Sequence, residues 1–163
     1  MADRPPSSEE HRPGARLTAA LESYASYLLW QATLRAQGLI RAALDPLGLR
    51  IPHHSVLRVL AEGARSQAAL ADALHTDRMM MVRVIDDLEG AGLVSRERNL
   101  RDRRAHDVTL TAEGKRVLDQ THTRVRAVDA ALLSPLSDAE REQFRALLAR
   151  VIEAHDRAAN PLP

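Results

Sequence analysis

The middle of the chain constrains the fold most, because the spacing of its apolar residues changes there from that of a helix to that of a hairpin. Apolar side chains first recur at positions i, i+3, i+4 and i+7, on one helix face: Met81, Val84, Ile85 and Leu88. Gly90 and Gly92 then provide a C-cap and an exit turn. Two β-prone segments, 93–95 and 108–110, flank an arginine-rich loop, 96–104. The sequence therefore predicts an amphipathic helix followed directly by a basic β-hairpin.

The charge of this loop is local. Its five arginines against Glu97 and Asp102 leave five positive charges minus two negative, or +3, whereas the whole chain carries +1. Of the 23 basic residues only Lys115 is lysine, so the clustering of arginine carries more weight than its abundance. A basic hairpin after an amphipathic helix is suited to binding a polyanion. A solvated surface turn would carry the same charges, so the elements around the hairpin decide between these interpretations.

Composition limits the class of protein. The 163 residues fit one domain of ordinary size. Apolar residues make up 45% of the chain and aromatic residues 2%, so the core is mainly Ala, Leu and Val, which favours helices. So few rings argue against binding single-stranded nucleic acid by base stacking. The absence of cysteine excludes disulfides, thiol redox sensing and cysteine-ligated zinc.

The first residues and the hydropathy bear on localisation. Residues 1–16 are rich in Pro, Ser, Glu and Arg and are predicted to be a disordered tail, and residues 159–163 form a C-terminal tail. The polar start is no signal peptide, and no apolar run approaches the roughly 18 residues of a membrane helix. We therefore expect a soluble, cytoplasmic protein without a membrane partner.

Three helices are predicted ahead of the one that carries Met81. The first covers residues 17–44 and ends at Asp45-Pro46-Leu47-Gly48. Pro52 opens the second, which stops at Gly63. Ser66 is the expected N-cap of the third, and the tight turn His75-Thr76-Asp77 follows it. The residues of this third helix expected to face inward are Ala69, Leu70, Ala73 and Leu74.

Two further helices are predicted after the hairpin. The first starts at Thr111 and is broken by Ser134-Pro135, and Ser137 with Glu140 forms a capping box for the second. The apolar residues expected on one face of each are Val117, Thr121, Val125, Val128 and Leu132, then Phe144, Leu147, Leu148 and Val151. The terminal helices are amphipathic and have no obvious partner within a small domain, so pairing with a second chain would bury them. The alternative is that they fold back on their own domain.

The expected fold is mainly α with a small β-hairpin. Two short helices joined by a tight turn and followed by a basic ribbon make a winged helix-turn-helix, which we place at residues 47–114. Its second helix is sized for the major groove of B-DNA, and the ribbon can reach the adjoining minor groove. Residues 17–44 and 115–158 are then the N- and C-terminal dimerisation helices.

The ordered residues of this region resemble those of the MarR (multiple antibiotic resistance regulator) family of transcription factors. The match runs over roughly residues 47–114, and the long flanking helices fit that family's dimerisation elements. The residues that carry the resemblance are Leu70-Ala71-Asp72-Ala73-Leu74, Val84-Ile85-Asp86-Asp87-Leu88-Glu89, Gly92-Leu93-Val94, Arg96, Asp102-Arg103-Arg104 and Leu110-Thr111-Ala112-Glu113-Gly114.

The resemblance implies a homodimer that binds near-palindromic double-stranded DNA, as a repressor released by a small ligand. In the wing, Asp102 would brace Arg104 so that its guanidinium enters the minor groove, although the two could form only a local ion pair. Thr76 would meet a phosphate near the helix N-terminus. The DNA-contact residues expected are Ser66, Thr76, Arg78, Met79, Met80, Arg83, Arg98, Arg101, Asp102, Arg103 and Arg104.

Some positions depart from the family pattern. His75 stands where the turn usually has Gly, and histidine tolerates a positive φ better than most residues. Met79, Met80 and Val82 stand where the recognition helix usually shows Ser or Thr. Methionine can still contact a thymine methyl, or Met80 could pack in the core. Asp77, Asp86, Asp87 and Glu89 against Arg78 and Arg83 leave this helix at two minus four, or −2. We therefore expect weaker hydrogen-bonded readout and more reliance on the wing.

Proteins of this family often release DNA when a small aromatic or anionic molecule enters a cleft beside the dimerisation helices. The residues here that could line such a cleft are Tyr24, Tyr27, Trp30, His53, His54 and Arg58. Trp30 could stack on a planar ligand. The alternatives are that Tyr27 and Trp30 are core residues and that His53 and His54 form a solvated helix start.

Other functions have weaker sequence support. Seven histidines suggest metal binding, but no HxxxH or HxH spacing occurs, and His53 and His54 point about 100° apart on a helix. We expect no cofactor and no metal ligands, with a metal-responsive regulator as one alternative. No nucleophile elbow or phosphate-binding glycine loop is present, so we expect no enzyme. The other alternative is a winged-helix protein-interaction module that does not bind DNA.

Overall fold

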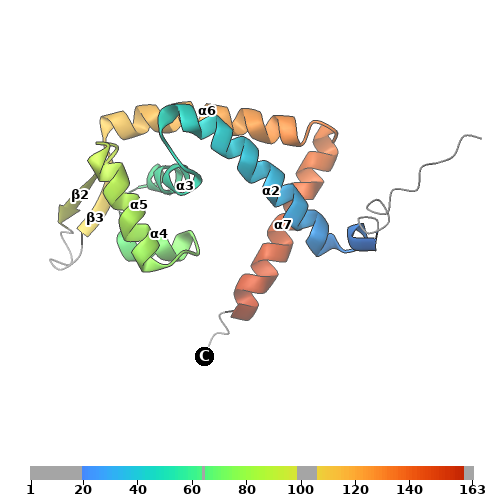
Figure 1. The fold of residues 1–163 in the computed structure, drawn as a ribbon. Helices are drawn as coiled ribbons and strands as arrows, with labels where there is room; N and C mark the ends of the chain where they lie inside the picture. The colour runs from blue at the N-terminus through green and yellow to red at the C-terminus, as the bar shows by residue number, and fades with distance from the viewer. Residues whose placement is uncertain (1–19, 64, 99–105, 160–163) are drawn as a thin grey trace, which may run out of the picture. The chain divides into compact units, whose positions relative to one another are not determined.

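The computed structural model describes residues 20–63, 65–98 and 106–159. The chain divides into two compact units, the first ending at Gly38 and the second beginning at Leu39. In chain order the elements are α2 (Ala25–Leu44), the 3-10 helix η1 (Asp45–Leu47), α3 (Ile51–Leu60), β1 (Arg65–Ser66), α4 (Gln67–Ala73), α5 (Arg78–Gly90), β2 (Val94–Arg98), β3 (His106–Leu110), α6 (Ala112–Leu132) and α7 (Asp138–Ala159) (Figure 1).

The first predicted helix, residues 17–44, is interrupted near its start, and residues 17–19 lie outside the described residues. Residues 20–22 are helical, but the chain leaves the helix at Ser23 and Tyr24 before α2 begins at Ala25. The Ser23 hydroxyl donates to the carbonyl oxygen of Ala20 at 2.8 Å. Such a local side-chain bond competes with continuation of a helix. The predicted end is confirmed, because Pro46 lies in η1 and Gly48 adopts a left-handed φ of 66°.

The core of the second unit forms where α5 packs against α3 and α4, α3 packs against α6, and these helices contact the strands. The predicted stripe on α5 is confirmed, and all four of its residues are buried. The prediction for α4 is wrong at Ala69 and Ala73, which are exposed, while Ala71 is buried. Leu70, Ala71 and the partly buried Leu74 lie within about 100° of one another around the helix axis and form the buried face. Ala69 and Ala73 lie on the other side of α4. The largest fully buried side chains are Leu44, Leu57, Leu70, Met81, Ile85, Leu88, Val56, Val84, Val108 and Thr121.

The turn between α4 and α5 closes α4 with a Schellman motif. The N–H of His75 donates to Asp72 at 3.2 Å, and the N–H of Thr76 donates to Ala71 at 3.0 Å. This motif requires a left-handed residue after the C-cap, and His75 supplies it with a φ of 46°. The expected tight turn therefore forms with histidine in the position that glycine usually takes.

The sheet has three antiparallel strands in the order β1-β3-β2. The predicted hairpin is present but longer than expected, since β2 and β3 pair from Val94 with Leu110 to Arg98 with His106. The third strand, β1, pairs Arg65 with Val108 and was not predicted. Its two residues are too few to show a strand pattern. The mainly α fold class with a small β-structure is confirmed.

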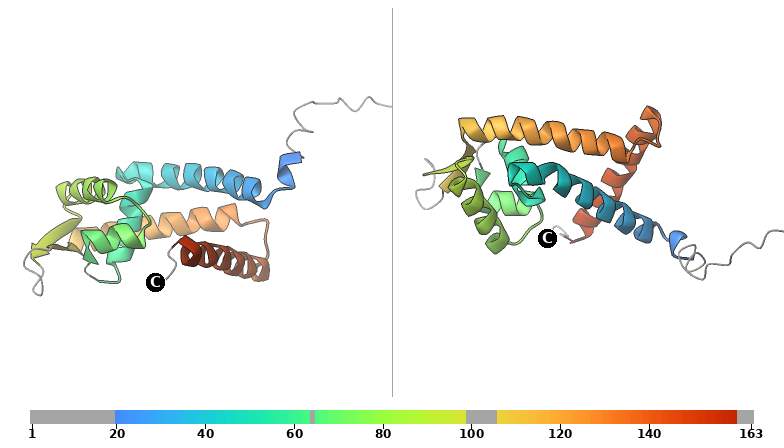
Figure 2. Two further views of the ribbon diagram at one scale, coloured as in Figure 1. Left: turned by 90° about the horizontal axis from the view of Figure 1, so that it is seen from below. Right: turned by 45° about the horizontal axis from the view of Figure 1, so that its top comes forward.

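Two long helices follow the hairpin. Thr111 caps α6 by accepting from the N–H of Gly114 at 2.9 Å, and its hydroxyl donates to the carbonyl of Gly92 at 2.7 Å. The capping box that starts α7 is confirmed, because the N–H of Ser137 donates to Glu140 at 2.8 Å. Figure 2 shows the sharp change of chain direction between α6 and α7. Among the helices in the described ranges, none is long and apolar enough to cross a membrane.

Candidate nucleic-acid interface

The side of α5 that faces away from the core carries two arginines and three apolar side chains. Met79 is 69% exposed, Met80 44% and Val82 40%. Arg78 and Arg83 are exposed as well, and neither pairs with an acidic residue within the described part of the chain. The exposure of Met80 contradicts core packing for this residue. Two guanidinium groups beside an apolar surface form the part of α5 available to a partner.

Two carboxylates near the end of α5 are held by one arginine of the hairpin. The guanidinium of Arg96 in β2 binds Glu89 through Nη1 and Asp86 through Nη2. The backbone N–H of Arg96 also donates to Glu89 at 3.1 Å. With its amide turned to satisfy both partners, Gln67 of α4 accepts from Arg96 Nε at 2.9 Å and Nη2 at 3.1 Å. Arg96 therefore joins the hairpin to both helices of the helix-turn-helix.

The guanidinium of Arg96 stays charged at its half-buried position. Burial lowers its pKa, but the hydrogen bonds to Asp86 and Glu89 outweigh burial, so the pKa of Arg96 is raised overall. An arginine fork that binds two carboxylates fixes direction as well as distance. We call these three side chains the Arg96 clamp.

A second group holds the remaining carboxylate of this helix end. Asp87 binds the guanidinium of Arg50, which precedes α3, and lies 3.3 Å from Nε2 of His53. The Nδ1 atom of His53 accepts from the N–H of Arg50 at 3.1 Å, so a neutral ring carries its proton on Nε2, facing Asp87. Burial lowers the pKa of His53, and this effect is larger than the rise in pKa caused by the hydrogen bond to Asp87. His53 is buried, which contradicts a solvated helix start at this residue.

The start of α5 is capped by its own side chain. Asp77 accepts from the N–H of Met80 at 2.7 Å, and Thr76 lies half-buried one residue earlier. Ser66 is the N-cap of α4, as predicted, and accepts from the N–H of Ala69 at 3.2 Å. The four acidic residues that gave α5 its net charge of −2 are thus all bonded to other groups of the protein. The net charge therefore overstates how strongly this helix repels an anion.

The arginines of the predicted basic loop divide into two groups. Arg96 and Arg98 belong to β2, not to the loop, because the strand extends to Arg98. The charge of Arg96 is balanced within its clamp, so the +3 assigned to the loop overstates the charge open to a partner. Arg101, Asp102, Arg103 and Arg104 lie outside the described residues.

Comparison with known proteins agrees with this fold. The MarR family model matches residues 49–106. The transcriptional repressor Rv2887 of Mycobacterium tuberculosis is 32% identical over 126 residues, which cover 77% of this chain and 91% of that protein. The chain belongs to the MarR family. It is a DNA-binding transcriptional regulator, and the predicted resemblance is confirmed.

Solved structures of MarR-family proteins share the fold. A transcriptional regulator from Rhodococcus sp. RHA1 aligns with a TM-score of 0.75 and 29% identity, covering 80% of this chain and 94% of that one. Rv2887 in complex with DNA aligns with a TM-score of 0.67 and 30% identity over 78% of this chain and 97% of that one. Rv2887 in complex with salicylic acid aligns with a TM-score of 0.65 and 32% identity over 78% and 96%.

The aromatic residues considered for ligand binding in this MarR-family chain lie in its first unit. Tyr27 and Trp30 form a tilted ring pair with centroids 5.8 Å apart, and Gln31 donates to the Tyr27 hydroxyl at 3.0 Å. Trp30 is 55% exposed, which contradicts a core position for this ring in the single chain. Tyr24 lies in the interruption just before α2 and is exposed.

The other ligand candidates lie in the second unit, on α3. The ring of His54 lies with Nδ1 2.9 Å from the Thr121 hydroxyl, which itself donates to the carbonyl of Leu118 at 2.9 Å. The hydroxyl therefore accepts from His54 Nδ1–H. Burial, then the charges of His122 and Arg58, lower the pKa of His54. His54 is half-buried, not solvated, and Arg58 is exposed. In the described ranges no three His, Cys, Asp or Glu side chains could together hold a metal ion.

Sequence reasoning missed the residues that hold α5 in place, namely Arg50, Gln67 and the role of Arg96. A signal was present, because the last turn of α5 carries Asp86, Asp87 and Glu89 where basic residues are favoured. Acidic residues at that end need cations from elsewhere. The sequence did not show which arginines supply them.

Proposed function

We propose that this protein is a homodimeric repressor that binds a near-palindromic site in double-stranded DNA and leaves it when a small aromatic or anionic molecule binds. The observation that carries the proposal is the division of α5 along its length. Its first two turns expose Arg78 and Arg83, whereas its carboxylates are bound by Arg50 and Arg96. A helix with this charge division can enter the major groove without presenting bare anions to the phosphates.

Pairing of two chains is supported by the last helix. Leu147, Val151 and Ile152 of α7 are each about half exposed in the single chain and lie on neighbouring rows of the helix. Apolar side chains gathered in this way are stabilised by a second copy that covers them. Two copies would set their α5 helices about one turn of DNA apart, near 34 Å, which matches a near-palindromic site.

The wing completes the proposed contact with DNA. Arg98 is the last residue of β2, and β2 packs against α5. We place Arg104, braced by Asp102, in the minor groove, with Arg101 and Arg103 near the phosphates. The Arg96 clamp supports this arrangement, because it ties the base of the wing to the helix that reads the major groove.

Release by a small molecule rests on the relatives and on the exposed rings. Rv2887 has been crystallised with salicylic acid, an aromatic anion. Trp30 and Tyr27, which form a ring pair, offer ring faces suited to such a molecule. Addition of salicylic acid should therefore raise the dissociation constant for DNA, measured by fluorescence anisotropy.

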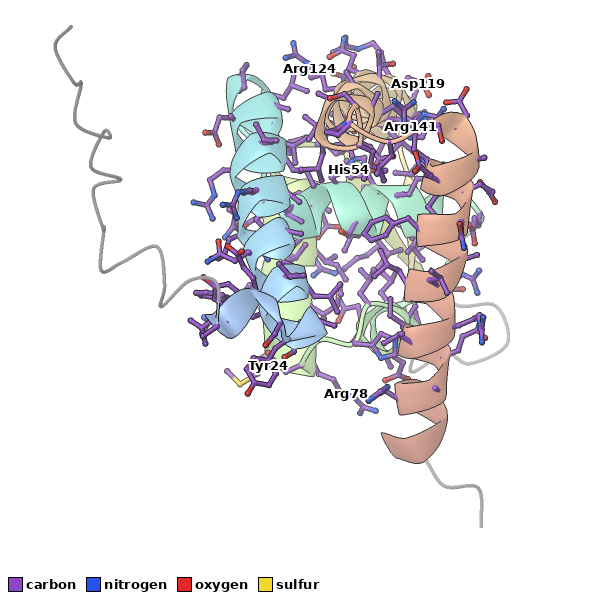
Figure 3. The ribbon with its side chains drawn as sticks, turned by 90° about the vertical axis from the view of Figure 1, so that its right-hand side faces the viewer. Tyr24, His54, Arg78, Asp119, Arg124 and Arg141 are labelled. Atoms are coloured by element: carbon purple, nitrogen blue, oxygen red, sulfur yellow. The ribbon has the colours of Figure 1, made fainter. Side chains whose placement is uncertain are left out.

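The test of DNA binding compares the two exposed arginines of α5 with an exposed arginine of α6. Figure 3 shows Arg78 of α5 and Arg124 of α6 at opposite ends of the view. A base or phosphate contact by an arginine contributes about 1 kcal/mol or more, so loss of both copies in a dimer costs about 2 kcal/mol or more and lowers affinity about 30-fold or more. Arg78→Ala and Arg83→Ala should each weaken binding to the DNA upstream of the protein's own gene by this amount, and Arg124→Ala by less than about twofold.

The same measurement separates the alternatives. Equal losses in all three variants would show that only net charge matters, which contradicts a reading role for α5. Failure of the parent protein to bind any duplex would favour the protein-interaction module. Loss of binding on addition of a chelator would favour the metal-responsive regulator.

A further inference from the structure

The exposed face of α5 is short of hydrogen-bonding groups. The sequence of this helix, RMMMVRVIDDLEG, contains no hydroxyl and no amide side chain. Its carboxylates are bound by Arg96 and Arg50. Arg78 and Arg83 are therefore the only side chains of α5 that can donate hydrogen bonds to base edges. Recognition by this helix needs another kind of contact for the rest of its surface.

An apolar side chain occupies the centre of that surface. Met79 and Leu88 are nine residues apart, which places them about 180° apart around the helix axis. Leu88 is buried in the core, and Met79 is the most exposed large apolar side chain of the second unit at 69%. Val82 and Arg83 follow Met79 by three and four residues and lie beside it one turn later. The residue that points straight away from the core is thus a methionine.

Its exposure is not explained by the fold. Met79 makes no contribution to the buried core of the second unit, and Val82 is 40% exposed. An apolar pair at the centre of a surface that carries two arginines indicates an occupant with both apolar and acceptor groups. In the major groove the C5 methyl of thymine is the apolar group, and N7 and O6 of guanine are the acceptors that arginine binds.

We propose that α5 recognises its DNA site chiefly through contacts of Met79 and Val82 with thymine C5 methyl groups, with Arg83 bound to an adjacent guanine. This inference rests on the proposed function and specifies what the same helix reads. Methionine suits the contact, because its flexible, polarisable side chain fits an apolar surface closely. This helix then recognises its DNA site by the methyl groups of thymine. A helix with amide or hydroxyl side chains would recognise its site by hydrogen bonds.

Replacement of thymine by uracil tests the inference, since it removes the methyl group and leaves base pairing intact. The full-length protein is first used to select binding duplexes from a randomised pool, and each thymine of the selected site is then replaced in turn. Burial of one methyl group changes affinity roughly three- to fourfold. Replacement of the symmetric pair in both half-sites should therefore weaken binding about tenfold, and replacement outside the two major-groove segments should have no effect.

A protein variant assigns the contact to its residue. Met79→Gln keeps the length and the helix propensity of the side chain and removes its apolar end, and Met79 is too exposed for the change to affect folding. The variant should lose the preference for thymine over uracil at the base that Met79 contacts. Val82→Thr is isosteric with the parent residue and should reduce discrimination at a neighbouring thymine. Thermal unfolding of each variant verifies that the fold is retained.

The outcomes are distinct. If no duplex is enriched, both the proposed function and this inference fail, and a protein partner for the apolar face is favoured instead. If a site is enriched but uracil substitution has no effect, the proposed function stands and the inference is overturned. If Met79→Gln still prefers thymine over uracil to the same degree as the parent, the assignment to Met79 is overturned.

Discussion

Replacement of Arg96 by lysine would test whether the Arg96 clamp positions the wing. Lysine keeps the positive charge, but it lacks the planar fork that binds Asp86 and Glu89 together. A charge-assisted hydrogen bond contributes roughly 1.5–3 kcal/mol. We take less than half of this, because the side chains of Asp86 and Glu89 are 56% and 39% exposed and their interaction with Arg96 is screened by solvent. The expected loss in the free energy of unfolding is therefore about 1 kcal/mol, or about 2–4 °C in Tm.

The effect on DNA binding should be larger than the effect on stability. In the variant neither wing of the dimer is held in place before DNA binds, so two costs of about 1 kcal/mol add to about 2 kcal/mol. This corresponds to a roughly 30-fold rise in Kd. Fluorescence anisotropy with a labelled operator duplex at fixed salt measures this change. Arg124→Lys is the matched control, since it makes the same change on the exposed face of α6, and its Kd should stay within about twofold of the parent. If Arg96→Lys bound DNA as tightly as the parent, charge alone would suffice and the positioning role would be refuted.

A Cβ at Gly114 would overlap the carbonyl oxygen of Leu93, so Gly114→Ala should lower the free energy of unfolding, measured in urea, by about 3 kcal/mol or more. Gly90→Ala is the control, because a Cβ at Gly90 meets no atom within 4 Å. It should raise the free energy of unfolding by up to about 1 kcal/mol. Burial lowers the pKa of His53 and His54 below 6.5, so near that pH the unfolded chain binds more protons than the folded chain. The free energy of unfolding should therefore be fully retained above about pH 6.5 and should fall as the pH drops below it. A His54→Asn variant should show a shallower pH dependence. Arg104→Ala should weaken DNA binding severalfold or more, and binding by the parent should fall steeply between about 50 and 200 mM salt, whereas a flat salt response would argue against phosphate contacts.

The parts of the fold that the sequence predicted are those set by local interactions. The stripe on α5 depends only on spacing, and the caps at Ser66, Thr111 and Ser137 are bonds between residues three apart. The recognition helix and the hairpin were therefore placed correctly, and so was the turn at His75. Local rules were less reliable where two of them compete, as at Ser23, whose side chain bonds to the backbone and interrupts the first helix.

The parts that were missed depend on contacts between distant residues. Arg50 and Asp87 are 37 positions apart, and nothing in either segment indicates the other. Arg96 was predicted as part of a basic loop because its neighbours in sequence are basic, but its neighbours in space are acidic. The strand β1 exists only because β3 provides a partner for two residues. Pairing partners of this kind follow from the fold, and short-range patterns do not contain them.

The acidic end of α5 shows how such distant contacts serve the proposed DNA contact. Carboxylates in the last turn of a helix face the negative end of its dipole, so Asp86, Asp87 and Glu89 disfavour the isolated helix. Arg96 and Arg50 offset this only when the hairpin and the start of α3 are in place. The helix is therefore held most firmly by charge at the end that carries these acids, while its first two turns keep their arginines and apolar side chains exposed. Removing the carboxylates would strengthen the helix on its own but would leave the wing and α3 without their anchors, so we infer that the acids are kept to position the lobe and not to stabilise α5 itself.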